Sequence, residues 1–243
     1  MKISTIIAAY NEEENIVELI QRLTNVFRSV NIDYEIILVI QGKDNALEVL
    51  QDFIDRTKSP IHILYYENPL GVGMAFKIGF HNISPDSTYI LTMDADLNHQ
   101  PEDLPRFLRA FDYNSVDIVI GSRYIPGGIM KNVYMWRYVL SKFVNDMFTY
   151  LSDLKIKDKT SGYRLQKKEV VFSLRDKIKT KHFDFYVDYL MMAKKAGFSM
   201  MEIPITFIAR TRGRSKMKVI DTLFCYCMLI IKTFKSNFLR NER

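Results

Sequence analysis

The chain has 243 residues, of which 48% are apolar and 26% are charged. This composition excludes an intrinsically disordered protein, and the length suits one α/β domain with little room for a second. The net charge of +6 favours an anionic partner such as a phosphate or a membrane surface. Basic and aromatic residues do not alternate in one patch and no nucleic-acid motif occurs, so we expect no nucleic-acid partner.

The first half of the chain alternates between short apolar runs and amphipathic segments, which predict buried strands and helices. We expect Asn11 to cap the first helix together with Glu14. The expected strands cover 3–9, 35–40, 61–66, 89–93 and 117–121, and the later helices cover 45–57, 74–81 and 102–111. This order predicts an α/β fold in which a mostly parallel central sheet is flanked by helices.

The second half of the chain is less regular. Residues 136–151 and 185–195 predict helices, and Pro204 indicates that the strand expected over 200–207 lies at a sheet edge or bulge. Residues 211–218 are polar and basic, as in a loop. No run reaches about 18 uninterrupted apolar residues, so we expect no membrane-spanning helix.

The last apolar segment predicts a long helix over 219–238. We divide the chain into a catalytic domain, 1–215, and a C-terminal amphipathic segment, 216–243. Its apolar side either packs on the domain or enters the headgroup region of a membrane, with Lys232, Lys235 and Arg240 on anionic lipids. Cys225 and Cys227 lie on different faces of this helix, which indicates buried, unpaired thiols in a reducing compartment.

The most informative motif is an Asp-x-Asp, Asp94 and Asp96, directly after a predicted buried strand. Open parallel sheets bind ligands at the carboxyl ends of their strands. Two carboxylates at such an end can share a divalent cation, Mg²⁺ or Mn²⁺, which can bridge a diphosphate and stabilise a leaving nucleotide. The motif therefore predicts a metal-dependent site for a nucleotide diphosphate.

The chain resembles glycosyltransferase family 2, whose nucleotide-sugar-binding fold is called GT-A. The resemblance is carried by the opening strand with Tyr10-Asn11-Glu12, by Leu70-Gly71-Val72-Gly73 and by Asp94-Ala95-Asp96-Leu97-Asn98-His99. Within the family it is most similar to dolichol- or polyprenol-phosphate mannosyltransferases. Four further segments indicate this: Gly121-Ser122-Arg123-Tyr124, Trp136-Arg137 with Ser141, Thr160-Ser161-Gly162-Tyr163-Arg164, and Glu202-Ile203-Pro204-Ile205 followed by Arg210, Arg212 and Lys216.

The resemblance implies roles for individual residues. Asp94 would contact donor and metal, Asp96 would ligate the metal, and Asn98 would complete the metal shell. Arg123, with Arg137 and Ser141, would hold the acceptor phosphate, and Arg123 would also act in catalysis. The donor and its nucleotide would be bound by Ala9, Tyr10, Glu12, Gln41, Gly71, Asp94, Ala95, Arg210, Arg212 and Lys216, the last three on a loop over the diphosphate.

Three positions depart from the family pattern. Gln41 stands where an acid usually reads the nucleotide base, although its amide can also bond a base edge. Asn98 replaces a glutamine and offers the same carbonyl on a shorter arm. Asp188 stands where a glutamate is more usual.

The resulting hypothesis is an inverting transfer of a hexose to a polyprenol or dolichol phosphate by a peripheral enzyme at the cytoplasmic face of a membrane. Mannose from GDP-mannose is favoured, and glucose from UDP-glucose is next. An ionised acceptor phosphate needs no strong base, so catalysis reduces to positioning and electrostatics.

Two alternatives stay open. A saccharide or other hydroxyl acceptor would require a carboxylate base, for which Asp184 and Asp188 are candidates. A non-catalytic nucleotide-sugar-binding subunit would explain the missing acids after the second strand. A partner that supplies a membrane anchor is compatible with each of these hypotheses.

Overall fold

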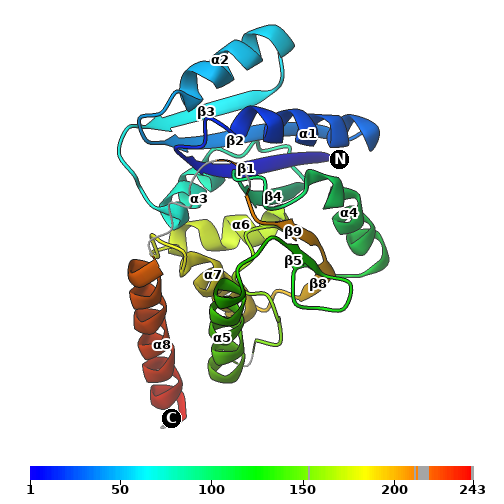
Figure 1. Cartoon of the computed structure of the whole chain (residues 1–243). Helices are drawn as coiled ribbons and strands as arrows, with labels where there is room; N and C mark the ends of the chain where they lie inside the picture. Colours follow the sequence, from blue (N-terminus) through cyan, green and yellow to red (C-terminus); the bar gives the residue numbers. More distant parts are fainter. Residues whose placement is uncertain (153, 211, 213–218, 242–243) are drawn as a thin grey trace.

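The computed structural model describes residues 1–152, 154–210, 212 and 219–241. A mixed seven-stranded sheet forms the centre, in the order β3-β2-β1-β4-β7-β5-β8, and β6 and β9 form a second, two-stranded sheet (Figure 1). The strands are β1 (Lys2–Tyr10), β2 (Asp33–Gln41), β3 (Ile61–Tyr66), β4 (Tyr89–Asp94), β5 (Ile118–Ser122), β6 (Ile129–Lys131), β7 (Arg164–Lys167), β8 (Met200–Pro204) and β9 (Thr206–Ile208).

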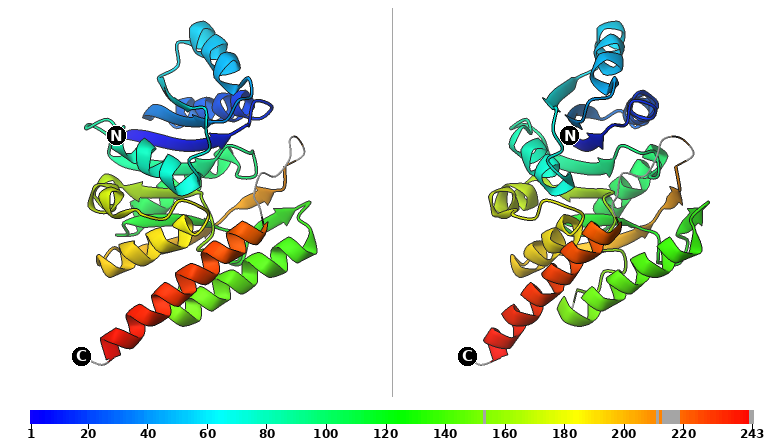
Figure 2. Two further views of the ribbon diagram at one scale, coloured as in Figure 1. Left: turned by 90° about the vertical axis from the view of Figure 1, so that its left-hand side faces the viewer. Right: turned by 60° about the vertical axis from the view of Figure 1, so that its left-hand side comes forward.

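The helices cover both faces of the central sheet (Figure 2). The α-helices are α1 (Ile16–Ser29), α2 (Ala46–Thr57), α3 (Val72–His81), α4 (Leu104–Tyr113), α5 (Met135–Ser152), α6 (Lys168–Leu174), α7 (Phe185–Lys195) and α8 (Val219–Asn241). Two short 3₁₀ turns, η1 (Pro101–Asp103) and η2 (Arg175–Lys177), follow β4 and α6. The predicted α/β architecture is confirmed.

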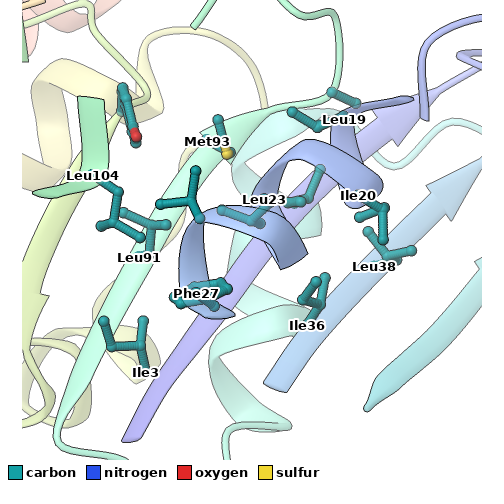
Figure 3. Close-up of a cluster of buried hydrophobic side chains, with 14 of the residues drawn as sticks. Ile3, Leu19, Ile20, Leu23, Phe27, Ile36, Leu38, Leu91, Met93 and Leu104 are labelled. Carbon is teal, nitrogen blue, oxygen red and sulfur yellow. The ribbon is translucent and has the colours of Figure 1, made fainter. Parts of the chain in front are cut away.

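Alternation along the strands produces two apolar layers. Ile3 of β1 packs with Leu23 and Phe27 of α1 (Figure 3). Ile7 belongs to the same cluster, whereas Ile6 faces the opposite side against Phe76 of α3. All six side chains are fully buried. Since successive residues of a strand point to opposite faces, a strand that is apolar throughout must be covered on both sides.

Strand β7 was not expected from the sequence. It runs antiparallel between β4 and β5, with Leu165 opposite both Leu91 and Val119. The strands β3, β2, β1 and β4 are parallel, as predicted. The sheet is therefore mixed around β7, and the loop before this strand returns residues 160–163 to the carboxyl end of β4.

The predicted capping role of Asn11 is wrong. The first helix begins at Ile16, after Asn15, and no side chain caps its N-terminus. Asn11 instead has a left-handed backbone with φ of 50°. Its side-chain oxygen accepts the backbone N–H of Lys43 at 3.1 Å, which joins the ends of β1 and β2.

The segment expected as one strand over 200–207 is two strands. β8 pairs with β5 at the edge of the central sheet, as Pro204 predicted, and the chain then leaves that sheet at Ile205. β9 pairs with β6, and His99 forms an isolated antiparallel bridge with Phe207. This break brings the segment before Arg210 beside the loop that follows Asp96.

Helices α5 and α8 lie side by side below the sheet (Figures 1 and 2). Val144 and Phe148 of α5 pack with Tyr226 and Leu229 of α8 in a separate apolar cluster. Among the described residues, no helix is long and apolar enough to cross a membrane. Both cysteines are free, but Cys225 is half-buried and Cys227 is exposed, so the expectation of two buried thiols is wrong.

Candidate active site

The acid pair lies at the carboxyl edge of the sheet. Asp94 is the last residue of β4 and is opposite Ala8 of β1. Asp96 follows in a loop that turns at Leu97, whose φ is 60°. The side chains of Asp94 and Asp96 are 31% and 14% exposed. Both carboxylates thus keep an open edge, as a ligand site requires.

Asp94 is held from its buried side. Its Oδ1 accepts a hydrogen bond from the Tyr186 hydroxyl of α7 at 2.5 Å. Its Oδ2 lies 3.7 Å from Nδ1 of His99. Burial raises the pKa of Asp94 above its ordinary value, although the Tyr186 hydrogen bond and the charges of Arg123 and Arg210 oppose this.

Asp96 is paired with a cation of the chain itself. Its Oδ2 lies 2.5 Å from Nη2 of Arg210, and Nη1 of the same guanidinium lies 3.0 Å from Oε1 of the buried Glu12. Burial and the charge of Asp94 raise the pKa of Asp96, and the charge of Arg210 opposes them. Two neighbouring carboxylates that resist ionisation favour a nearby positive charge.

The residues present fit a hard divalent cation. Asn98 donates its Nδ2 to Asp96 at 2.7 Å, which leaves its buried Oδ1 without a hydrogen-bond partner among the described residues. Carboxylate and amide oxygens are the ligands that Mg²⁺ and Mn²⁺ prefer. The described residues contain no group of three or more His, Cys, Asp or Glu side chains that could hold a metal. The set suits a cation whose remaining ligands come from a bound diphosphate.

The residues predicted to line the donor pocket differ in how far their side chains are exposed to solvent. Tyr10 is 37% exposed, whereas Ala9 and Ala95 are buried. Gln41 is 3% exposed, and its Oε1 accepts the backbone N–H groups of Leu70 and Gly71 at 2.7 and 3.2 Å. The Gln41 carbonyl thus fixes the turn before α3, and only its amide nitrogen is left for a nucleotide base.

Gly71 belongs to a close backbone approach. Its φ is 86°, and a Cβ there would lie 2.4 Å from the carbonyl oxygen of Lys181. A side chain at this turn would therefore displace the segment that leads into α7.

The two described arginines of the predicted donor loop, Arg210 and Arg212, contact different parts of the protein. Arg210 reaches the acid pair, but Arg212 is exposed and forms an ion pair with Glu18 of α1 at 3.1 Å. Lys216, with its neighbours Gly213, Arg214 and Ser215, lies outside the described residues, as does the side chain of Arg240. Of the two loop cations that the structure describes, Arg210 contacts the acid pair and Arg212 does not.

Two of the predicted acceptor residues, Ser141 of α5 and Arg123, meet at Thr160. Arg123 Nε and Nη2 donate to the two oxygens of the fully buried Asp158, each at 2.7 Å, and Nη2 also donates to Thr160. The Ser141 hydroxyl lies 3.3 Å from the Thr160 hydroxyl. The bidentate edge of Arg123 is thus occupied, and Nη1 is the part of the guanidinium that the described contacts leave for an anion.

Arg137 occupies the first turns of α5. Its guanidinium carbon lies 5.2 Å from the centre of the Trp136 ring, and its buried Nε has no partner among the described residues. The unpaired Nε of Arg137, one helical turn from Ser141, fits an anion site. None of the described contacts joins Arg137 to Arg123.

Several residues at the site were not predicted. Tyr186 and Asp158 carried no signal in the sequence, because their contacts span 92 and 35 residues along the chain. His99 stood within the quoted motif without a role. Burial lowers the pKa of His99 to about 4, so its imidazole is neutral near pH 7.

The two candidate carboxylate bases differ. Asp184 precedes α7, burial raises its pKa, and its Oδ1 has no partner in the described part of the chain. Asp188 is 6% exposed and lies 3.6 Å from Nζ of Lys232. Asp184 is the better candidate for a base, whereas Asp188 contacts α8.

Comparison with known proteins places this site in a family. The model described as Glycosyl transferase family 2 matches residues 4–174. The polyprenol monophosphomannose synthase of Mycolicibacterium smegmatis is 34% identical over 215 residues, 87% of this chain and 79% of that protein. The undecaprenyl-phosphate mannosyltransferase of Micrococcus luteus is 32% identical over 219 residues, 89% of this chain and 88% of that protein.

A third relative is longer than this chain. The dolichol-phosphate mannosyltransferase of Pyrococcus furiosus is 34% identical over 238 residues, which cover 97% of this chain and 64% of that protein. The chain therefore spans about two thirds of that relative's length.

Two solved structures show the same fold. The glucosyl-3-phosphoglycerate synthase of Mycobacterium tuberculosis, in complex with Mn²⁺, UDP and glucosyl-3-phosphoglycerate, has a TM-score of 0.66 at 16% identity and covers 97% of this chain and 79% of its own. The mannosyl-3-phosphoglycerate synthase of Rubrobacter xylanophilus has a TM-score of 0.65 at 13% identity, covering 100% and 75%. At these identities the likeness establishes the fold alone.

The sheet with an acid pair at its carboxyl edge has the GT-A fold. The chain belongs to glycosyl transferase family 2 and is a glycosyltransferase. The resemblance inferred from the sequence is confirmed, including the likeness to the polyprenol-phosphate mannosyltransferases.

Proposed function

We propose that this enzyme transfers mannose from GDP-mannose to a polyprenol or dolichol phosphate, with inversion at the sugar carbon and with a bound divalent cation. The observation that carries the proposal is the acid pair between two arginine groups. Arg210 lies on Asp96, and the charge of Arg123 also acts on Asp94. The relatives named mannosyltransferases support the choice of sugar and acceptor.

On the donor side, Asp94, Asp96 and Asn98 would hold Mg²⁺ or Mn²⁺, which would neutralise the donor diphosphate and ease departure of the nucleotide. Arg210 would move from the carboxylates to the diphosphate once that cation is in place. Tyr10, Glu12 and the amide nitrogen of Gln41 would face the nucleotide. UDP-glucose remains the second donor candidate.

On the acceptor side, Arg123 Nη1, Arg137 and Ser141 would bind the lipid phosphate. Asp158 fixes the Arg123 guanidinium in one orientation, which spares the entropy of ordering it when the phosphate binds. The ionised phosphate oxygen attacks the sugar carbon directly, so no residue of the chain has to remove a proton.

The membrane surface would be met by α5 and α8. Phe224, Met228 and Ile231 form one exposed apolar stripe on α8, and Trp136, Val139 and Phe143 form another on α5. The two helices pack together, and Ser141 of the proposed phosphate site lies on α5. We place the enzyme peripherally at the cytoplasmic face, with segment 216–243 as the contacting part and a membrane-anchoring partner compatible with it.

The decisive experiment incubates purified protein with radiolabelled GDP-mannose, polyprenol phosphate and Mn²⁺, and measures label extracted into organic solvent. We expect a lipid-soluble product that Asp96→Asn abolishes. Asp112→Asn, an exposed acid on α4, is the matched control and should keep full activity. A parallel assay uses radiolabelled UDP-glucose. Product from UDP-glucose but not from GDP-mannose would make UDP-glucose the donor, and no product from either donor would contradict the proposal.

A hydroxyl acceptor is the second candidate, because Asp184 has the raised pKa and the unpaired oxygen expected of a base. Under this alternative Asp184→Asn would abolish transfer to saccharides while leaving donor hydrolysis intact. Transfer to polyprenol phosphate that survives Asp184→Asn would favour the first proposal.

A further inference from the structure

His99 is a buried imidazole with two unpaired nitrogens at the edge of the site. Its side chain is 2% exposed, and its ring packs against Tyr163 and edge-on against Phe207, with centroids 5.4 and 5.5 Å away. Neither ring nitrogen has a hydrogen-bond partner among the residues that the structure describes. Buried polar groups are nearly always paired, so this one calls for an explanation.

The ring faces the first acid of the motif. Nδ1 lies 3.7 Å from Oδ2 of Asp94, which is longer than a hydrogen bond but within a small displacement of one. Oδ1 of the same carboxylate already accepts from Tyr186. A Cβ at Gly162 would lie 2.9 and 3.0 Å from the two Asp94 oxygens, so the absence of a side chain there leaves Asp94 room.

We propose that His99 is a positioning residue for Asp94, donating its Nδ1–H to Oδ2 in the metal-loaded enzyme while Tyr186 donates to Oδ1. This inference rests on the proposed function, because it assigns a role within the same metal site. Each oxygen keeps a lone pair on its open edge for the cation and the donor. Hydrogen bonds to ligating carboxylates fix their orientation and contribute to metal affinity.

The surroundings of the ring favour positioning over direct ligation. Tyr163 and Phe207 enclose an imidazole that is 2% exposed, whereas the carboxylate in front of it is 31% exposed. The backbone of His99 is also bridged to Phe207 of β9. A cation that enters from the open side meets Asp94 first, with the imidazole behind it.

Three substitutions separate the two nitrogens. His99→Phe keeps the ring packing and removes both nitrogens. His99→Asn places an amide N–H near the Nδ1 position, whereas His99→Gln places one near Nε2. Mn²⁺ affinity is measured on donor-free protein by electron paramagnetic resonance, the melting temperature reports the fold, and kcat and KM for the donor are compared.

We expect His99→Phe to weaken Mn²⁺ binding by about tenfold and to lower kcat, as found when such supporting groups are removed from metal sites. Its melting temperature should stay close to that of the wild type. His99→Asn should recover most of the affinity and His99→Gln should not. If His99→Phe does not fold, the comparison of Asn with Gln alone decides the matter.

Three results would overturn the proposal. One is wild-type Mn²⁺ affinity and kcat in His99→Phe, and another is rescue by Gln rather than Asn. The third is a directly bound nitrogen in the spin-echo modulation of Mn²⁺, which would make His99 a ligand. If wild-type protein binds Mn²⁺ no better than Asp96→Asn, the metal site itself fails, a result distinct from failure of His99 alone.

Discussion

Arg210 and Asp96 are 114 residues apart in the chain, yet their side chains meet at 2.5 Å at the carboxyl edge of the sheet. The guanidinium also bonds Glu12, so one cation of the chain pairs with two carboxylates. The Arg210 guanidinium occupies the Asp96 oxygen that a divalent cation would need as a ligand. Loading the site therefore requires Arg210 to give up this contact.

We expect Arg210→Gln to have opposite effects on metal and donor. Without the competing guanidinium, the donor-free protein should bind Mn²⁺ more tightly, and KM for the donor should rise because a diphosphate contact is lost. Calorimetric titration with Mn²⁺ and steady-state kinetics measure the two effects. Weaker Mn²⁺ binding in Arg210→Gln would show that Arg210 does not compete for Asp96.

Asp158→Asn should destabilise the fold. Asp158 is fully buried. Burial raises its pKa, but the charge and hydrogen bonds of Arg123 outweigh burial, so the pKa of Asp158 lies below its ordinary value. Removing one partner of a buried ion pair costs about 3–5 kcal/mol, because the other charge stays buried without compensation. Chemical denaturation measures the loss. The double variant with Arg123→Gln should regain part of it, and a purely additive double variant would contradict this coupling.

Glu35 should make stability depend on pH at the opposite edge of the sheet. Burial opposes ionisation of Glu35, but hydrogen bonds from Ser4 and Ser84 outweigh it and lower the pKa. A lowered folded-state pKa adds stability above the unfolded value of about 4.5, and this stability is lost as the pH falls through the folded pKa.

Urea denaturation of Glu35→Gln tests this at several pH values. At pH 7 the variant should be less stable by about 1–3 kcal/mol, because a buried charge-assisted hydrogen-bond network is lost. The difference should shrink below about pH 4. A difference that does not change with pH would mean that the Glu35 charge does not stabilise the fold.

Replacing Phe224 and Phe234 by serine should weaken binding to vesicles. Both side chains are more than half exposed on α8, and burying a phenylalanine in an apolar phase contributes about 1.5–3 kcal/mol. Each substitution should therefore reduce partitioning about tenfold or more, as measured by co-sedimentation with anionic vesicles. Tyr113→Ser on α4, an aromatic residue that is still more exposed, is the control. If the α8 variants and the Tyr113→Ser control lose vesicle binding equally, α8 is not the part of the protein that contacts the membrane.

Local patterns in the sequence were sufficient for the part of the fold that precedes residue 121. The apolar runs of β1, β2 and β4 identify strands covered on both faces, because every residue of such a run must be buried. The position of Asp94 at the end of one such run placed the acid pair at the carboxyl edge before any contact was known. The motifs also identified the family correctly.

The contacts that surround the acids were decided only by the tertiary structure. Nothing local predicts that β7 inserts antiparallel between β4 and β5, that Tyr186 reaches Asp94, or that Asp158 occupies the bidentate edge of Arg123. Hydrophobic periodicity encodes which face of an element is buried, but not which distant element covers it. Partners separated by 35 to 114 residues are chosen when the layers pack, and that choice sets the charge, orientation and exposure of each carboxylate.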